Sequence, residues 1–146
     1  MSKSNSFENA LLQLLFNNVD IANIGDAAGL QNSAVAGSLY LALHTADPGE
    51  AGNASTNECA YGSYARVAVA RTVGGWIVAS NTAENAALAQ FPECTSGSET
   101  ITYVSITSES SGASMILYSG ALTASRAVSS GIQPQFAATA LTVTED

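Results

Sequence analysis

Charged residues are scarce in this chain of 146 residues. They make up 11% of it, against about 25% in an average soluble domain. A low charge content suits surfaces that pack against other subunits, because interface cores are depleted of charged residues, although a weakly charged monomer would have the same composition. The few charges are mainly acidic, with four basic residues against twelve acids and a formal net charge of −8. Since no cluster of cations is present to neutralise phosphates, we predict that neither nucleic acid nor a membrane surface is a partner.

Long apolar runs are also missing. No stretch approaches the ~18 residues that a membrane helix requires, and the N-terminal residues lack the pattern of a secretory signal peptide. We therefore expect the protein to be made and kept in a cytoplasm. Cysteine is rare as well, and in a chain without secretion signals we expect Cys59 and Cys94 to be buried free thiols rather than a disulfide.

Patterns for catalysis and metal binding are equally sparse. His44 is the one histidine, and no G-x-S-x-G motif singles out a serine to act with it. One histidine and two distant cysteines do not form a zinc motif. The acidic loop at residues 47–58 offers oxygen ligands but departs from the EF-hand pattern at Gly49 and Ala51. We predict no catalytic residue, no cofactor and no metal, and hence no enzymatic activity.

Among the features that are present, the first is an amphipathic helix near the N-terminus. Asn5 has the character of an N-cap, Glu8 follows three residues later, and the helix should end near Asn17. Its apolar stripe consists of Phe7, Leu11, Leu14 and Leu15, widened by Leu12 and Phe16. A lone helix of about twelve residues is marginally stable. We therefore interpret the stripe as a contact surface that either docks on the sheet of the same chain or reaches a neighbouring subunit.

From Ser38 onward the pattern changes to short strands. Residues 38–44 alternate with a period of two and lead into Asp47-Pro48-Gly49, where glycine supplies the positive φ of a turn. Further strands are predicted at residues 64–71, 73–80, 81–91, 99–107, 114–120, 121–128 and 136–144. This spacing favours an antiparallel β-sandwich or a jelly-roll-like domain. We therefore predict a mainly β fold, with a β-sandwich domain at residues 38–146 after an N-terminal helical arm and irregular linker at residues 1–37.

The polar loop that follows the first strand is a second predicted contact surface. Its candidate side chains are Asp47, Glu50, Asn53 and Glu58. These side chains are more simply explained as a solvated or partner-contacting loop than as a calcium site.

Four segments of the β region carry a family resemblance. They read LYLALHTADPGEAG, TNECAYGSYARVAVAR, GGWIVASNTAENAALAQFPEC and SGIQPQFAATALTVTED, and they cover most of Leu39–Asp146. Together they resemble a family of small structural proteins of tailed bacteriophages, often labelled tail-fibre proteins. The resemblance implies a virion protein without catalytic activity, assembled in the host cytoplasm. Its implied partners are other virion proteins, either the major capsid protein or tail components.

Three functions remain open on these grounds. A fibre gains length from repeats, heptads or a long shaft, and this sequence has none of them. A compact acidic β-domain with an apolar arm instead fits a homo-oligomeric module placed in many copies on an assembled shell. Capsid decoration is therefore the first prediction and a role on the tail or tail fibre the second. The third is a host-glycan-binding module that uses exposed aromatic residues and loop 47–58.

Overall fold

The computed structural model describes every residue from Met1 to Asp146 and divides the chain into two compact units. Unit 1 consists of Met1–Ser38, Val69–Leu88 and Phe136–Asp146. Unit 2 consists of Leu39–Ala68 and Ala89–Gln135. The boundary predicted after residue 37 thus lies at the end of the first segment of unit 1, and two later segments complete that unit.

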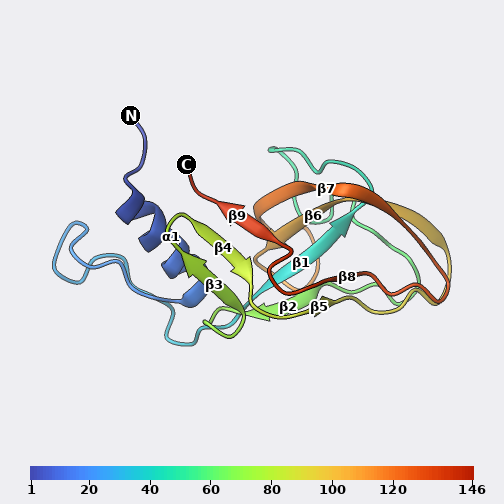
Figure 1. Ribbon diagram of the computed structural model, residues 1–146, viewed down its shortest axis with the longest axis horizontal. Helices are drawn as coiled ribbons and strands as arrows, with labels where there is room; N and C mark the ends of the chain where they lie inside the picture. The colour runs from blue at the N-terminus through green and yellow to red at the C-terminus, as the bar shows by residue number, and fades with distance from the viewer. The chain divides into compact units, whose positions relative to one another are not determined.

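Helix α1, Asn5–Asn17, belongs to unit 1 (Figure 1). Its N-cap is Ser4, so the prediction of Asn5 at this position is wrong by one residue. Ser4 has an extended backbone, and the amide of Phe7 donates to its carbonyl oxygen at 2.9 Å and to its side-chain hydroxyl at 3.4 Å. The helix ends as predicted, because Asn18 takes a left-handed φ of 56° and terminates it.

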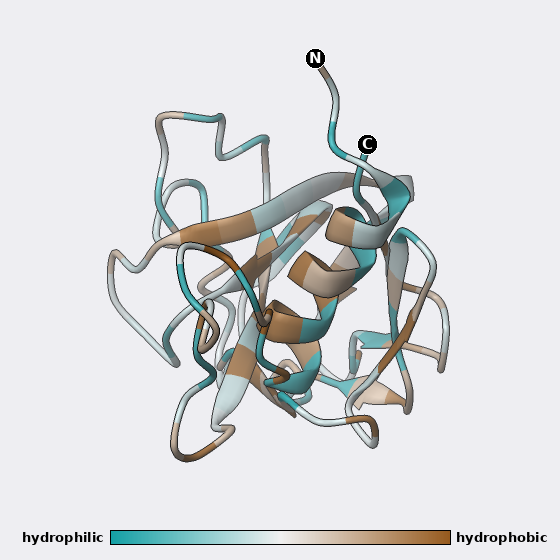
Figure 2. Cartoon of the chain, turned by 90° about the vertical axis from the view of Figure 1, so that its left-hand side faces the viewer, coloured by the Kyte–Doolittle hydropathy of each residue, from teal (hydrophilic) through white to brown (hydrophobic).

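Unit 1 packs α1 against a small antiparallel sheet of order β3-β4-β9. These strands are β3 Trp76–Ala79, β4 Thr82–Asn85 and β9 Thr142–Thr144. Leu12 and Phe16 are fully buried, and the ring of Phe16 meets the ring of Trp76 edge-on with centroids 4.7 Å apart. Figure 2 shows hydrophobic residues recurring along the turns of α1. The helix therefore docks on strands of its own chain.

Arg71 fastens the C-terminal end of α1. Its guanidinium donates hydrogen bonds to the carbonyl oxygens of Leu14 and Leu15, both at 2.7 Å, and to that of Ala36 at 3.2 Å. A cation at this position interacts favourably with the negative end of the helix dipole. The same side chain also ties the irregular segment after the helix to unit 1.

Unit 2 contains most of a four-stranded antiparallel sheet of order β2-β1-β6-β7. The strands are β1 Ser38–His44, β2 Val67–Ala70, β6 Ser98–Thr107 and β7 Ile116–Ser129. Strands β5 Ala89–Gln90 and β8 Gln135–Phe136 form a separate pair. Leu41 and Leu43 of β1 and Ile101 of β6 are fully buried in the core. Antiparallel β structure with one N-terminal helix is the predicted fold class, and it is confirmed.

Three predictions of strand boundaries are wrong. Residues 81–91 form two strands, β4 and β5, because the chain bends at residues 86–87 between them and the two strands join different sheets. Residues 114–120 and 121–128 do not form separate strands, because the chain makes no turn between them and continues as β7. The ladder adapts through a bulge, since Ile101 pairs with Arg126 and Tyr103 with Ala121, which leaves residues 122–125 opposite a single residue of β6. Residues 136–144 contain two short strands rather than one, because the chain turns between them, where Thr139 takes a φ of 60°.

The helical content of the chain is confined to α1, which lacks the length and apolar character required to cross a bilayer.

The buried contact between Phe16 and Trp76 leads to a stability prediction. Phe16→Ala should lower the free energy of unfolding of unit 1 by about 3–5 kcal/mol, since a buried aromatic ring leaves a cavity. Phe7→Ala is the matched control, because Phe7 lies on the same helix with 37% of its surface exposed, and it should cost about 1 kcal/mol or less. Urea unfolding followed by Trp76 fluorescence measures both values. Equal losses for the two variants would contradict docking through the Phe16 face.

Candidate functional site

His44 lies at the end of β1 and is fully buried within unit 2. Its Nδ1 is 2.9 Å from the carbonyl oxygen of Thr56, which can only accept, so we assign the ring proton to Nδ1. Nε2 then accepts a hydrogen bond of 2.7 Å from the hydroxyl of Ser105 on β6. Burial lowers the pKa of His44 below its ordinary value of 6.5. The imidazole is therefore neutral and joins the loop after β1 to the sheet.

The contact between Ser105 and His44 has the atoms of a nucleophile and base pair. Ser105 is 1% exposed and His44 is completely buried, so a substrate has no path to the hydroxyl in this structure. The sequence prediction that His44 is a strand-end histidine bonded to nearby backbone agrees with this geometry. The bond to Ser105, 61 positions away along the chain, depends on tertiary structure and carried no sequence signal.

Arg66 is the centre of a second buried polar cluster in unit 2. Its side chain is 1% exposed and forms a two-pronged ion pair with Glu58, with N–O distances of 2.6 and 2.8 Å. The other guanidinium N–H groups donate to the carbonyl oxygens of Glu109 and Gly112 and to the hydroxyl of Ser114. Every donor of the guanidinium is therefore used. The hydrogen bond to Glu58 also raises the pKa of Arg66.

Tyr64 closes this cluster. Its hydroxyl donates to a carboxylate oxygen of Glu58 at 3.1 Å and accepts from the amide of Leu43 at 3.0 Å. Burial raises the pKa of the Tyr64 hydroxyl. Arg66 thus binds the loop after β1 through Glu58, and it binds the loop between β6 and β7 through Glu109, Gly112 and Ser114.

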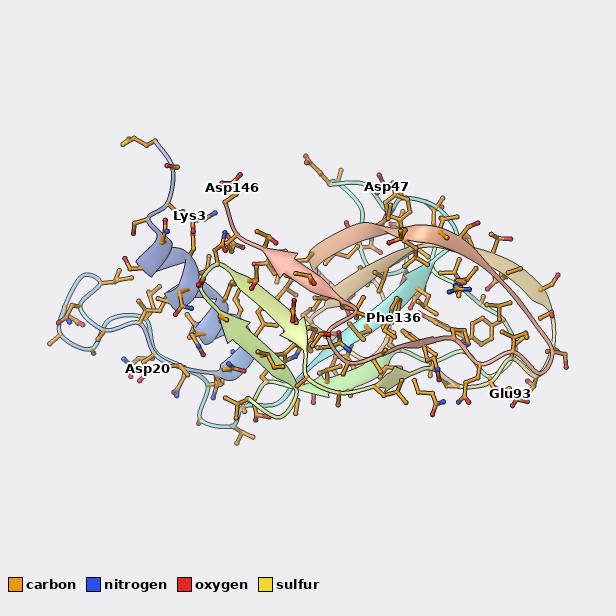
Figure 3. All side chains as sticks on the ribbon, in the orientation of Figure 1. Lys3, Asp20, Asp47, Glu93, Phe136 and Asp146 are labelled. Atoms are coloured by element: carbon orange, nitrogen blue, oxygen red, sulfur yellow. The ribbon has the colours of Figure 1, made fainter.

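Several side chains of the predicted contact loop at residues 47–58 therefore form bonds within the fold. Asp47, labelled in Figure 3, is exposed, and its carboxylate accepts from the amide of Gly49, which has the expected positive φ of 70°. Asn53 is half-buried and accepts from the amide of Ser55. Glu50 is exposed, whereas Glu58 holds Arg66. Of the predicted acidic loop residues, Asp47 and Glu50 are the exposed ones.

The predicted apolar stripe of α1 divides into two faces. Glu8, Leu12 and Phe16 form the buried face. The four predicted contact residues lie beside it, with Phe7 exposed and Leu11, Leu14 and Leu15 half-buried. The structure therefore keeps these four side chains together on the helix and leaves part of their surface open.

Unit 1 also contains a small polar pocket that sequence reasoning missed. It has a volume of about 260 Å³ and is lined by Ser2, Lys3, Asn5, Glu8, Ser80, Asn81 and Asp146. Lys3 forms an ion pair of 2.7 Å with Glu145, and this bond raises the pKa of Lys3. The sequence offered one signal for this pocket. Although charged residues are scarce in the chain, some of them lie near its two ends, and Lys3, Glu8 and Asp146 line the pocket.

Neither metal-binding clusters nor a disulfide are present. The structure has no group of three or more histidine, cysteine or acidic side chains that could hold a metal ion. Cys59 and Cys94 are both buried and free, as expected. Burial, with a smaller contribution from the Glu99 carboxylate, raises the pKa of the Cys59 thiol to about 12.

Comparison with known protein families matches residues 2–144 to the family described as podophage GP4 fiber I protein gp80. The chain belongs to this fibre protein family. The match confirms the resemblance to phage tail-fibre proteins and extends it to α1 and to the residues before Ser38. Membership identifies the chain as a structural protein of the phage virion. A search of curated proteins finds no match.

The buried neutral imidazole predicts a specific dependence of stability on pH. Above pH 6.5 His44 is neutral in both the folded and the unfolded state and contributes no slope. Below it the unfolded chain binds a proton that the folded chain does not, so stability should fall by up to about 1.4 kcal/mol per pH unit. His44→Gln should remove this component between pH 7 and 5.5. Equal slopes for wild type and variant in urea unfolding would contradict it.

The ion pair of Arg66 predicts a contrast between two acids of the same loop. Glu58→Gln should lower the free energy of unfolding by about 3 kcal/mol, because it leaves the buried guanidinium without its counter-charge. Glu50→Gln, at an exposed position, should change it by about 0.5 kcal/mol or less. Chemical denaturation at pH 7 measures the free energy of unfolding of both variants. If Glu58→Gln lowers it no more than Glu50→Gln does, the ion pair with Arg66 does not stabilise the fold as described.

Proposed function

We propose that this protein is a non-enzymatic subunit of a podophage fibre, where it binds other virion proteins through its surface. The observation that carries this proposal is the family match over residues 2–144. The internal hydrogen bonding of His44 and Arg66 supports it, because the side chains best suited to chemistry serve the fold instead. The low charge content of the chain is in keeping with a surface that packs against other subunits.

Within a fibre, the chain suits an end or a junction better than a shaft. A shaft gains its length from repeated strands or heptads, and this chain has neither. Its strands instead form small antiparallel sheets within compact units. The partner contacts of the proposed module are the open side of the α1 stripe at Phe7, Leu11, Leu14 and Leu15 and the exposed carboxylates of Asp47 and Glu50.

Capsid decoration, the first prediction from the sequence, is the second candidate. The observation in its favour is the absence of any shaft element in a compact acidic protein. The glycan-binding alternative loses its support, because Trp76 is fully buried and each of the five tyrosines is buried or half-buried. No exposed aromatic platform of tyrosine or tryptophan remains for a sugar ring.

The position of the protein on the virion separates the two candidates. Gold-labelled antibody on purified phage should decorate the tail fibres, and quantitative mass spectrometry should give a copy number set by the small number of fibres. Head proteins of known stoichiometry provide the internal standard. Label spread over the head at hundreds of copies per particle would overturn the fibre assignment and support decoration.

A further inference from the structure

The polar pocket of unit 1 contains a buried carboxylate that has no partner. Glu8 lies in the first turn of α1 and lines the pocket, with 6% of its surface exposed. Its carboxylate forms neither a hydrogen bond nor an ion pair, because the ammonium of Lys3, the one lysine of the chain, bonds to Glu145 instead at 2.7 Å. Buried carboxylates normally have a hydrogen-bonding or ionic partner, so the side chain of Glu8 has an unfilled requirement for one.

The position of Glu8 in the helix does not supply that partner. An acid in the first turn interacts favourably with the positive end of the helix dipole. The amides of Phe7 and Glu8, however, both donate to the carbonyl oxygen of Ser4 at 2.9 Å. The negative charge is therefore stabilised by the helix, while the oxygens of the carboxylate remain available as acceptors.

Hydrogen bonds between three segments hold the pocket in shape. Asn9 of α1 donates through Nδ2 to the carbonyl oxygen of Ser80, in the turn between β3 and β4, at 2.8 Å. Asn81 of the same turn forms two bonds with Glu145, since its Nδ2 donates to the carbonyl oxygen of Glu145 and its own carbonyl oxygen accepts from the amide of Glu145, both at 2.9 Å. The helix, the turn and the segment after β9 are thus joined around the pocket.

The charges that line the pocket select a cation as its ligand. Glu8 and Asp146 contribute carboxylates, and Lys3, the one basic lining residue, is already paired with Glu145 (Figure 3 labels Lys3 and Asp146). The bond to Glu145 raises the pKa of Lys3, and the charges of Glu8 and Asp146 add to this effect. An anion would be repelled here, and a neutral ligand would leave Glu8 without a counter-charge.

The acceptors of the pocket suit an ammonium group better than a metal ion. The chain has no group of three or more histidine, cysteine or acidic side chains that could hold a metal. An alkyl ammonium group has three N–H donors. The pocket offers three acceptors for them, because the Nδ2 of Asn81 is bonded to Glu145 and its side-chain oxygen joins the two carboxylates. The volume of about 260 Å³ admits several heavy atoms, since one water occupies about 30 Å³ of liquid.

We propose that this pocket binds a protonated primary amine, whose ammonium group donates hydrogen bonds to Glu8, Asp146 and the side-chain oxygen of Asn81. A free diamine and the lysine side chain of another virion protein present the same ammonium group, so either can be the source. The proposal does not depend on the fibre assignment, because it concerns a site within unit 1.

Nuclear magnetic resonance titration of the ¹⁵N-labelled protein at pH 7 and constant ionic strength tests the site. The probes are 1,4-diaminobutane and lysine blocked at both backbone ends by acetyl and methylamide groups. Saturable shifts are expected for the amides of the lining residues. Tetramethylammonium carries the same charge without N–H donors and should produce no saturable shift. Binding of the diamine alone would identify a free amine as the source, and binding of blocked lysine as well would identify a protein side chain.

Three variants separate recognition by the pocket from general attraction to an acidic protein. Glu8→Gln should weaken amine binding by about tenfold, the effect of losing one charge-assisted hydrogen bond. Asp146→Asn, at an exposed position where the fold should tolerate it, should also weaken binding. Glu84→Gln is the matched control, since Glu84 is a half-buried acid on β4 of unit 1 outside the pocket, and it should bind like wild type.

Thermal unfolding of each variant establishes that it is folded before its affinity is compared. The absence of saturable shifts with either amine at tens of millimolar would overturn the proposal. Equal binding of tetramethylammonium would also overturn it, as would folded Glu8→Gln and Asp146→Asn variants that bind amines as tightly as Glu84→Gln does.

Discussion

The ion pair between Arg66 and Glu58 is the constraint on which unit 2 depends. Removing two charges from water costs several kcal/mol for each ion, and the cost is offset only when their geometry and remaining hydrogen bonds are complete. Here the carboxylate binds two guanidinium nitrogens and Tyr64, while the remaining N–H groups bind the loop between β6 and β7. Two loops that are distant in sequence are thereby held in one arrangement.

This constraint also changes the interpretation of the loop after β1. From the sequence, its carboxylates formed a single polar surface. In the structure they have different roles, because Glu58 neutralises a buried cation while Asp47 and Glu50 stay exposed. His44 has a similar role, since both of its ring nitrogens are bonded within unit 2. His44, Glu58 and Arg66 are thus used for folding, because their polar atoms are bonded within unit 2.

Local patterns predicted the parts of the fold that local physics determines. The period-two pattern of residues 38–44, the positive φ of Gly49 and the end of α1 at Asn18 all follow from neighbouring residues. Ser4 and Asn5 are both good N-caps, so sequence alone could not choose between them. The continuity of β7 was missed because Gly120 resembles a boundary, and a bulge is visible only once β6 is paired with it. The partners of Arg66 and Arg71 required tertiary structure, since they lie far away along the chain.

The central claim is that this chain is a fibre subunit whose surface, rather than a chemical site, performs its function. A cryo-electron microscopy reconstruction of the podophage tail and head at a resolution that separates β-strands tests it most directly. The account predicts density for this chain in the fibre, with α1 packed on its own strands and the exposed side of the α1 stripe facing another virion protein. Density for the chain on the head alone, with none in the fibre, would contradict it.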